Sequence, residues 1–134
     1  MARFEVAMVE AQDYAFQELR SLLPVRDFDL KRLSELELLA PERLGNARLV
    51  VVGEDRADPW RGIALLGRLA ESRPSLSAIL LAWKSSEELA IAALRAKATD
   101  YFAPPIRLRD VAARIRTIAS GFLPPTSAAR TAGR

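Results

Sequence analysis

The chain contains neither cysteine nor histidine. Without cysteine it can form no disulfide framework and no thiolate metal site. Without histidine it also lacks the commonest general base, the centre of a Ser-His-Asp triad and the usual nitrogen ligand of zinc. Enzymes and metal proteins that depend on these groups are therefore excluded.

Long apolar runs are also missing. The run from Ala78 to Trp83 is far short of the roughly 20 residues that a membrane-spanning helix needs. The N-terminus has no basic region followed by an apolar one, as a secretion signal would have. We therefore expect a cytoplasmic protein that does not enter a membrane.

What the chain does contain is the composition of an ordinary globular domain. It has 134 residues, of which 50% are hydrophobic and 28% are charged, which is enough for one core and too little for two ordinary domains. We expect this domain to span residues 1–122. Residues 123–134 are rich in proline, alanine, serine and arginine without periodicity, and are expected to form a flexible tail or linker.

The net charge of +3 would suit an anionic partner if the arginines gathered on one face. Most of them are scattered along the sequence instead. This distribution argues against nucleic-acid binding by the domain.

The clearest pattern is an alternation between short β-like runs and longer helical ones, repeated five times along the chain. Such repetition is typical of α/β domains, in which helices cover both faces of a parallel sheet. The expected strands are residues 4–9, 28–33, 49–52, 76–82 and 100–103, and the expected helices are residues 13–23, 34–44, 60–71, 85–97 and 108–120.

Local signals place several helix boundaries. Ser85, followed three residues later by Glu88, predicts a capping box at the start of the fourth helix. Asp58 and Pro59 predict an N-cap and a first-turn proline for the third helix. In the last helix an apolar stripe predicts the face that packs against the sheet, and its members are Val111, Ile115, Ile118 and Phe122.

Doubly wound α/β proteins place their functional groups in loops at the carboxyl ends of the strands, near the point where the strand order reverses. In this chain those loops contain Glu10-Ala11-Gln12, Gly53-Glu54-Asp55, Ala82-Trp83 and Pro104-Pro105. Any functional site is therefore expected among these segments.

The stretch DYFAPPIRLRDVAARI, residues 100–115, carries a resemblance to a known family. In length and spacing it is similar to the end of response regulator receiver (CheY-like) domains, and the likeness extends over residues 3–121. The resemblance implies a flavodoxin-like (βα)5 fold with a parallel five-stranded sheet of order 2-1-3-4-5. It also places Tyr101 at the family's switch aromatic and Pro105 at the proline that follows a cis peptide bond.

The chain departs from the family at positions that phosphoryl transfer uses. Pro104 replaces the lysine that pairs with the phosphoryl oxygens, and Ala82 replaces the Thr or Ser hydroxyl. The acidic pair after the first strand becomes Glu10-Ala11, which leaves one carboxylate where the family uses two to help hold Mg²⁺. Glu10 and Asp55 remain as weak candidate ligands of that ion.

The phospho-acceptor position has two candidates. Counting back from Gly62 selects Glu54, whereas counting back from Pro59 selects Asp55. We favour Glu54, because Leu49–Gly53 then matches the apolar strand that precedes the acceptor. A glutamate there could imitate a phosphorylated state, since its carboxylate extends one methylene further out than that of aspartate.

The first functional hypothesis is a pseudo-receiver, a signalling module of a two-component (phosphorelay) pathway that is not an enzyme and binds no cofactor. It would act through contacts with a histidine kinase, an output domain or a second copy, without normal aspartyl phosphorylation. The alternative is a phosphorylatable receiver that uses Asp55, with Glu10 and Glu54 assisting Mg²⁺. A third hypothesis is a ligand or nucleotide in the crevice, although no Gly-rich phosphate loop follows any strand.

Two surface features are candidates for partner contacts. Trp83, beside the emptied site, either fills the space of the missing phosphoryl group or contacts a partner. The surface of the fourth helix, fifth strand and last helix is the family's usual partner or dimerisation face, and here it is either such a face or an ordinary solvated surface. It carries charges of both signs, namely Arg95, Lys97, Asp100, Asp110, Arg114 and Arg116.

Overall fold

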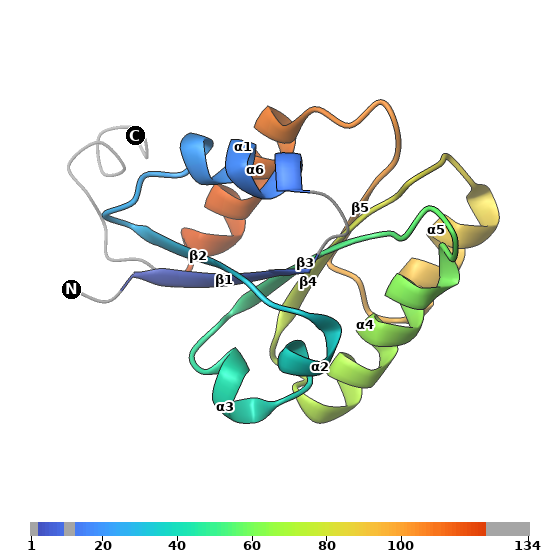
Figure 1. Cartoon of the computed structure of the whole chain (residues 1–134), viewed down its shortest axis with the longest axis horizontal. Coiled ribbons are helices and arrows are strands. Elements are labelled where there is room, and N and C mark those ends of the chain that lie inside the picture. The colour runs from blue at the N-terminus through green and yellow to red at the C-terminus, as the bar shows by residue number, and fades with distance from the viewer. Residues whose placement is uncertain (1–2, 10–12, 123–134) are drawn as a thin grey trace.

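A parallel five-stranded sheet of order β2-β1-β3-β4-β5 forms the centre of the molecule (Figure 1). The computed structural model describes residues 3–9 and 13–122. The predicted fold class and strand order are confirmed. The strands are β1 (Phe4–Val9), β2 (Phe28–Arg32), β3 (Leu49–Gly53), β4 (Ser77–Leu81) and β5 (Asp100–Phe102), and the helices are α1 (Asp13–Leu22), α2 (Glu35–Leu38), α3 (Pro41–Leu44), α4 (Trp60–Ser72), α5 (Glu87–Arg95) and α6 (Leu108–Ala119).

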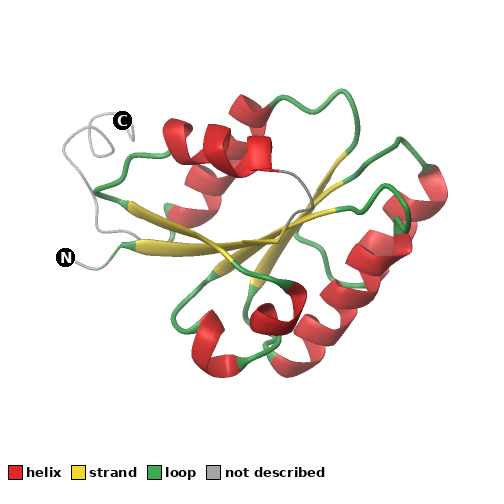
Figure 2. Ribbon diagram, viewed as in Figure 1, coloured by secondary structure: helices red, strands yellow, loops and turns green. Residues whose placement is uncertain are grey.

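The helices form two layers, one on each face of the sheet (Figure 2). Helices α1 and α6 cover one face, and α2 to α5 cover the other. Successive side chains of a strand point to opposite faces, so Val51 packs with the α1 and α6 layer while Val50 and Val52 pack with the α4 and α5 layer. This double burial explains why β3 is apolar at every position up to Gly53.

The position of β2 at the edge of the sheet explains its more polar sequence. It pairs with β1 alone, with Phe28 opposite Phe4, and only Phe28 among its residues is buried. Strand β1 pairs with both β2 and β3, so the strand order reverses beside it. The carboxyl ends of β1 and β3 therefore flank the point where doubly wound proteins place their sites.

The prediction of a single helix over residues 34–44 is wrong, because the structure has two short helices there. Ser34 caps α2 with a capping box, in which its hydroxyl accepts the Glu37 N–H and the Glu37 carboxylate accepts the Ser34 N–H. Ala40 is extended, with ψ 118°, and Pro41 begins α3. A proline has no N–H to continue a helix and disfavours helical geometry at the residue before it, which separates the two.

The start of α5 also differs from the prediction by one residue. Ser86, not Ser85, is the N-cap, and its hydroxyl accepts the Leu89 N–H at 3.2 Å. This register places Glu87 and Glu88 at the positive end of the helix dipole and turns Leu89 into the core. The Ser-x-x-Glu pattern is met only by Ser85, since Leu89 stands three residues after Ser86, but the burial of Leu89 selects the second serine.

Replacing Ser86 by alanine is expected to lower the free energy of unfolding by about 1 kcal/mol, because the Leu89 N–H loses its acceptor. Ser85→Ala is the matched control, and its effect should stay within about 0.5 kcal/mol. Urea denaturation of both variants measures the difference. Equal effects of the two substitutions would place the cap elsewhere.

No helix among the described residues is long and apolar enough to cross a membrane. Residues 123–134, expected to form a tail, lie outside the described residues.

Candidate functional site

A cleft of about 770 Å³ opens at the carboxyl edge of the sheet. Its floor and walls come from α1, from the loops after β3 and β4, and from the segment that leads into α6. Three of the four loops selected from the sequence thus contribute to one cleft or lie beside it, while the fourth, Glu10-Ala11-Gln12, is outside the described residues. The lining residues are Ala15, Glu18, Gly53, Glu54, Asp55, Arg56, Leu81, Ala82, Trp83, Ile106, Arg107, Leu108, Arg109 and Asp110.

Glu54 directly follows β3 and is the one charged side chain buried in the described part of the chain, at 7% exposure. Its backbone N–H donates to the Leu81 carbonyl at 2.9 Å, which continues the pairing of β3 with β4. Its Oε1 accepts the Trp83 N–H at 2.8 Å. Its Oε2 is buried and has no hydrogen-bond partner among the described residues. Among the described residues, the carboxylate is therefore bound at one oxygen only.

Burial raises the pKa of the Glu54 carboxyl above its ordinary value. The Trp83 N–H and the positive charge of Lys84 act in the opposite direction, but burial is the larger effect. The reason is that moving a carboxylate out of water penalises its charged form more than one backbone donor compensates. The ionised side chain is thus costly where it lies.

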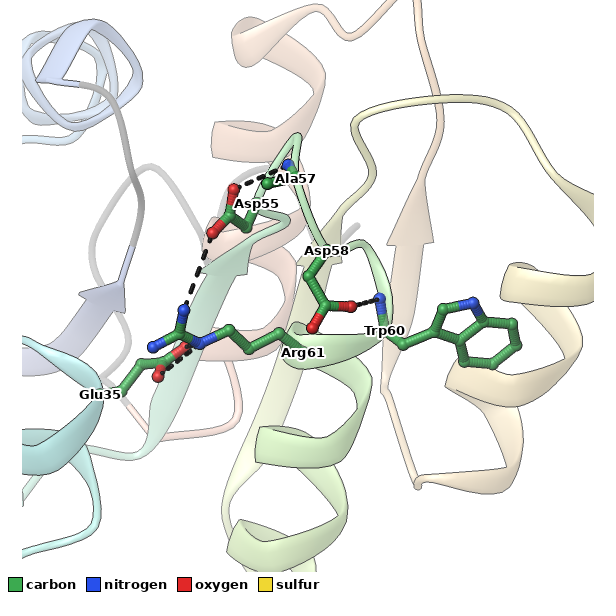
Figure 3. Close-up of polar contacts among 6 residues, drawn as sticks. All are labelled: Glu35, Asp55, Ala57, Asp58, Trp60 and Arg61. Carbon is green, nitrogen blue, oxygen red and sulfur yellow. Dashed lines mark hydrogen bonds and ion pairs between the residues drawn. The ribbon is translucent and has the colours of Figure 1, made fainter.

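Asp55, the neighbouring acceptor candidate, is turned toward its own loop (Figure 3). Its Oδ1 accepts the Ala57 N–H at 2.9 Å, and its Oδ2 lies 3.9 Å from the Arg61 guanidinium. Arg61 in turn forms a 2.9 Å ion pair with Glu35 of α2. The Trp60 indole points away from this group in the figure. Asp55 therefore links the β3–α4 loop to α4 and α2.

Ala82, which the resemblance aligns with the family's Thr or Ser, is buried, and only its backbone is polar. Its N–H donates to the Phe102 carbonyl at 2.8 Å. Tyr101, the candidate switch aromatic, is half-buried on β5, and its hydroxyl oxygen has no partner in the described part of the chain. Burial, and secondly the negative charge of Glu54, raise the pKa of Tyr101. The Pro104–Pro105 peptide bond is cis, the geometry that the resemblance implies at Pro105.

Trp83 lines the cleft with 41% of its surface exposed, so it does not fill a closed pocket. The Arg56 guanidinium lies 4.3 Å from the centre of its ring, a cation–π contact. Sequence reasoning singled out Trp83 but missed Arg56, Arg107 and Arg109, which line the same cleft. Their only signal in the sequence is their position, with Arg56 in the loop after β3, Arg107 in the loop after β5 and Arg109 in the first turn of α6.

The six charged residues expected on one interaction face differ in their surroundings. Asp100 and Arg114 form an ion pair at 3.1 Å. Arg95 and Lys97 line a separate groove beside α4, whereas Asp110 lines the cleft at the carboxyl edge. Arg116 donates to the Leu22 carbonyl at the end of α1 and therefore faces that helix. A homodimer through this face stays a prediction.

The side chains in the described residues do not supply the ligand set that Mg²⁺ requires, which is several oxygens around one point. No group of three or more Asp, Glu, His or Cys side chains is arranged there to hold a metal ion. The free oxygen of Glu54 is buried, and the Asp55 carboxylate is engaged by Ala57 and Arg61. Glu10, the other weak candidate, lies outside the described residues.

No family model matches the chain, and no curated protein matches it. Solved structures do match. A response regulator from Thermotoga maritima has a TM-score of 0.76 at 23% identity, covering 89% of this chain and 99% of that one. The receiver domain of a Francisella response regulator has a TM-score of 0.75 at 18% identity, covering 90% and 100%. An orphan response regulator of H. pylori has a TM-score of 0.73 at 22% identity, covering 87% and 98%.

These similarities span nearly the whole length of both chains. The chain therefore has the CheY-like fold of response regulator receiver domains, as the resemblance in the sequence implied.

Proposed function

We propose that the chain is an atypical receiver module of a two-component pathway that acts through protein contacts, without normal aspartyl phosphorylation. The observation that carries this proposal is the Glu54 carboxylate. It lies at the end of β3, is buried, and is bound by the Trp83 N–H of the neighbouring strand's loop. At the position that the resemblance assigns to the phospho-acceptor, the chain would then carry a built-in carboxyl group in place of an aspartyl phosphate.

The groups missing from the cleft support the same proposal. Phosphoryl transfer depends on positioning and on stabilising charge, with little covalent chemistry for the protein to do. Pro104 has neither the positive charge nor the N–H that could neutralise a phosphoryl group, and Ala82 has no hydroxyl to bond it. Asp55, the acceptor in the alternative function, has its carboxylate turned to Ala57 and Arg61.

Glu54 also connects the buried end of β3 to the molecular surface. Its hydrogen bond to the Trp83 N–H fixes the start of the β4–α5 loop. The Trp83 side chain projects from that same residue into the cleft, where Arg56 lies against it. A fixed carboxylate would therefore hold one arrangement of this aromatic and cationic surface.

A histidine kinase, an output domain or a second copy of the chain are the partners that this role implies. The module would work in the cytoplasm, where two-component signals are received, and would have no enzymatic activity of its own.

Incubation with Mg²⁺ and acetyl phosphate, followed by intact-mass measurement, tests the proposal. We expect no gain of a phosphoryl group under conditions that modify an ordinary receiver treated in parallel. The Asp55→Asn variant is the matched control. A phosphoryl adduct that appears in the native chain and is lost in this variant would overturn the proposal and establish Asp55 as the acceptor.

A further inference from the structure

The cleft at the carboxyl edge has a cationic rim. Arg56, Arg107 and Arg109 line it, and Lys84 follows Trp83 beside it. All four side chains are exposed. None of them lies within ion-pair distance of a carboxylate whose position the structure describes, whereas Arg43, Arg61 and Arg114 elsewhere all have such partners. Within the described residues, the rim therefore offers several cations that have no ion-pair partner.

Two of these cations stand at an electrostatically unfavourable place. Arg107 is the N-cap of α6 and provides no side-chain acceptor for the first N–H groups of that helix. Arg109 lies in the first turn, so both positive side chains sit at the positive end of the helix dipole. Asp110 is the one acidic residue in that turn. An external carboxylate at this rim would relieve the repulsion and meet free N–H donors.

The cleft between these cations is partly apolar. Ile106, Leu108 and Ala82 contribute to its lining, and the exposed Trp83 ring forms part of its wall. Tryptophan and arginine are the residues most often found at the energetic centres of protein interfaces. The Arg56–Trp83 stack combines the two in one contact. The surface therefore fits a partner that brings carboxylates together with an apolar side chain.

We propose that this cleft docks an acidic segment of a partner protein, with its carboxylates on Arg56, Arg107 and Arg109 and an apolar side chain against Trp83. The inference rests on the proposed function in taking the partner to be a protein. A nucleic acid fits less well, because Glu18, Asp55 and Asp110 line the same cleft and would repel a continuous phosphate backbone. The separate charges of a peptide can avoid these carboxylates.

The test uses the full chain and a short synthetic peptide in which glutamates flank two leucines. The indole N–H resonance of Trp83, assigned with a Trp60→Phe variant, reports binding by NMR titration. We expect a saturable shift that is absent with the matched peptide in which glutamines replace the glutamates. The double substitution Arg107→Gln and Arg109→Gln should weaken binding about tenfold, since it removes two charge contacts.

A pair of cations that are also exposed but lie outside the cleft provides the control. Arg68→Gln with Arg95→Gln removes the same net charge from the groove beside α4 and should leave the affinity within about twofold, the change expected from long-range charge alone. Equal weakening by both double variants would overturn the proposal, because net charge would then explain the binding. Tighter binding of single-stranded oligothymidylate at the same resonance would overturn it in favour of a nucleic acid. The titration contains neither Mg²⁺ nor acetyl phosphate. A failure to bind the peptide is therefore distinguishable from phosphorylation of Asp55, the result that would overturn the proposed function.

Discussion

Replacing Ile115 by alanine is expected to lower the free energy of unfolding by about 3 kcal/mol. Ile115 has 0% exposure and lies on the face of α6 that packs against the sheet, in one cluster with Val51 and Ile79. Alanine would leave a cavity lined by rigid strands and by α1, which the surrounding structure cannot fully close. Urea denaturation followed by circular dichroism measures the loss.

Ile91→Ala is the matched control for this substitution. Ile91 is 43% exposed on the outer face of α5, so the same truncation removes less buried surface and should cost under about 1 kcal/mol. Similar losses for the two variants would mean that α6 does not pack on the sheet as described.

Replacing Glu54 by glutamine is expected to raise the free energy of unfolding at pH 7 by about 1 kcal/mol, because removing the buried charge outweighs the cost of the amide NH2 group that then lies without a partner in place of Oε2. Glutamine keeps an oxygen for the Trp83 N–H and removes the buried charge. Denaturation in urea at neutral pH measures the gain. Glu71→Gln, an exposed change on α4, is the control and should alter stability by less than about 0.5 kcal/mol.

The increase in the free energy of unfolding caused by Glu54→Gln should become smaller as the pH falls. Burial raises the pKa of Glu54 in the folded state above its ordinary value of 4.5. The folded state therefore holds the proton more tightly than the unfolded state does, and stability falls as the pH rises from the unfolded toward the folded pKa. Below the ordinary value both states are protonated, so the native chain and Glu54→Gln should differ little. A gain that persists undiminished at acidic pH would contradict this account.

A buried carboxylate in the lining of a cleft, expected to lower stability, is typical of a functional group. Stability and function often conflict at such positions, and the rest of the fold offsets the cost. The layer around Ile115 contributes stability, whereas the ionised Glu54 carboxylate is expected to reduce it. The proposed role of Glu54, to hold Trp83 in one arrangement, is what would maintain the residue.

The architecture could be predicted from the sequence because its signal is spread over many residues. The apolar runs at residues 49–52 and 76–82 and the stripe through Val111 and Ile115 each agree with the same α/β alternation. An error at one residue does not change such a pattern. Single-residue signals were less secure, as the choice between Ser85 and Ser86 and the break at Pro41 illustrate.

The candidate site could be predicted only as a region. Glu54 and Asp55 are adjacent acids after one strand, and counting from Gly62 or from Pro59 separates them by a single residue. Their environments are nevertheless opposite, since Glu54 is buried against the Trp83 N–H whereas Asp55 is turned to Arg61. Neighbouring residues at the end of a strand point to opposite sides, and which side is buried depends on the helices that cover it.

The sequence by itself determined the class of fold and the approximate bounds of its elements, because these follow from residue type and periodicity. Tertiary structure decided which carboxylate is buried, where the charges of the expected interaction face lie, and that Arg56, Arg107 and Arg109 line one cleft with Trp83. The physical reason is that parallel strands bring their carboxyl ends to one edge. Loops that are distant in the chain become neighbours there, and no local pattern records which side chains will meet.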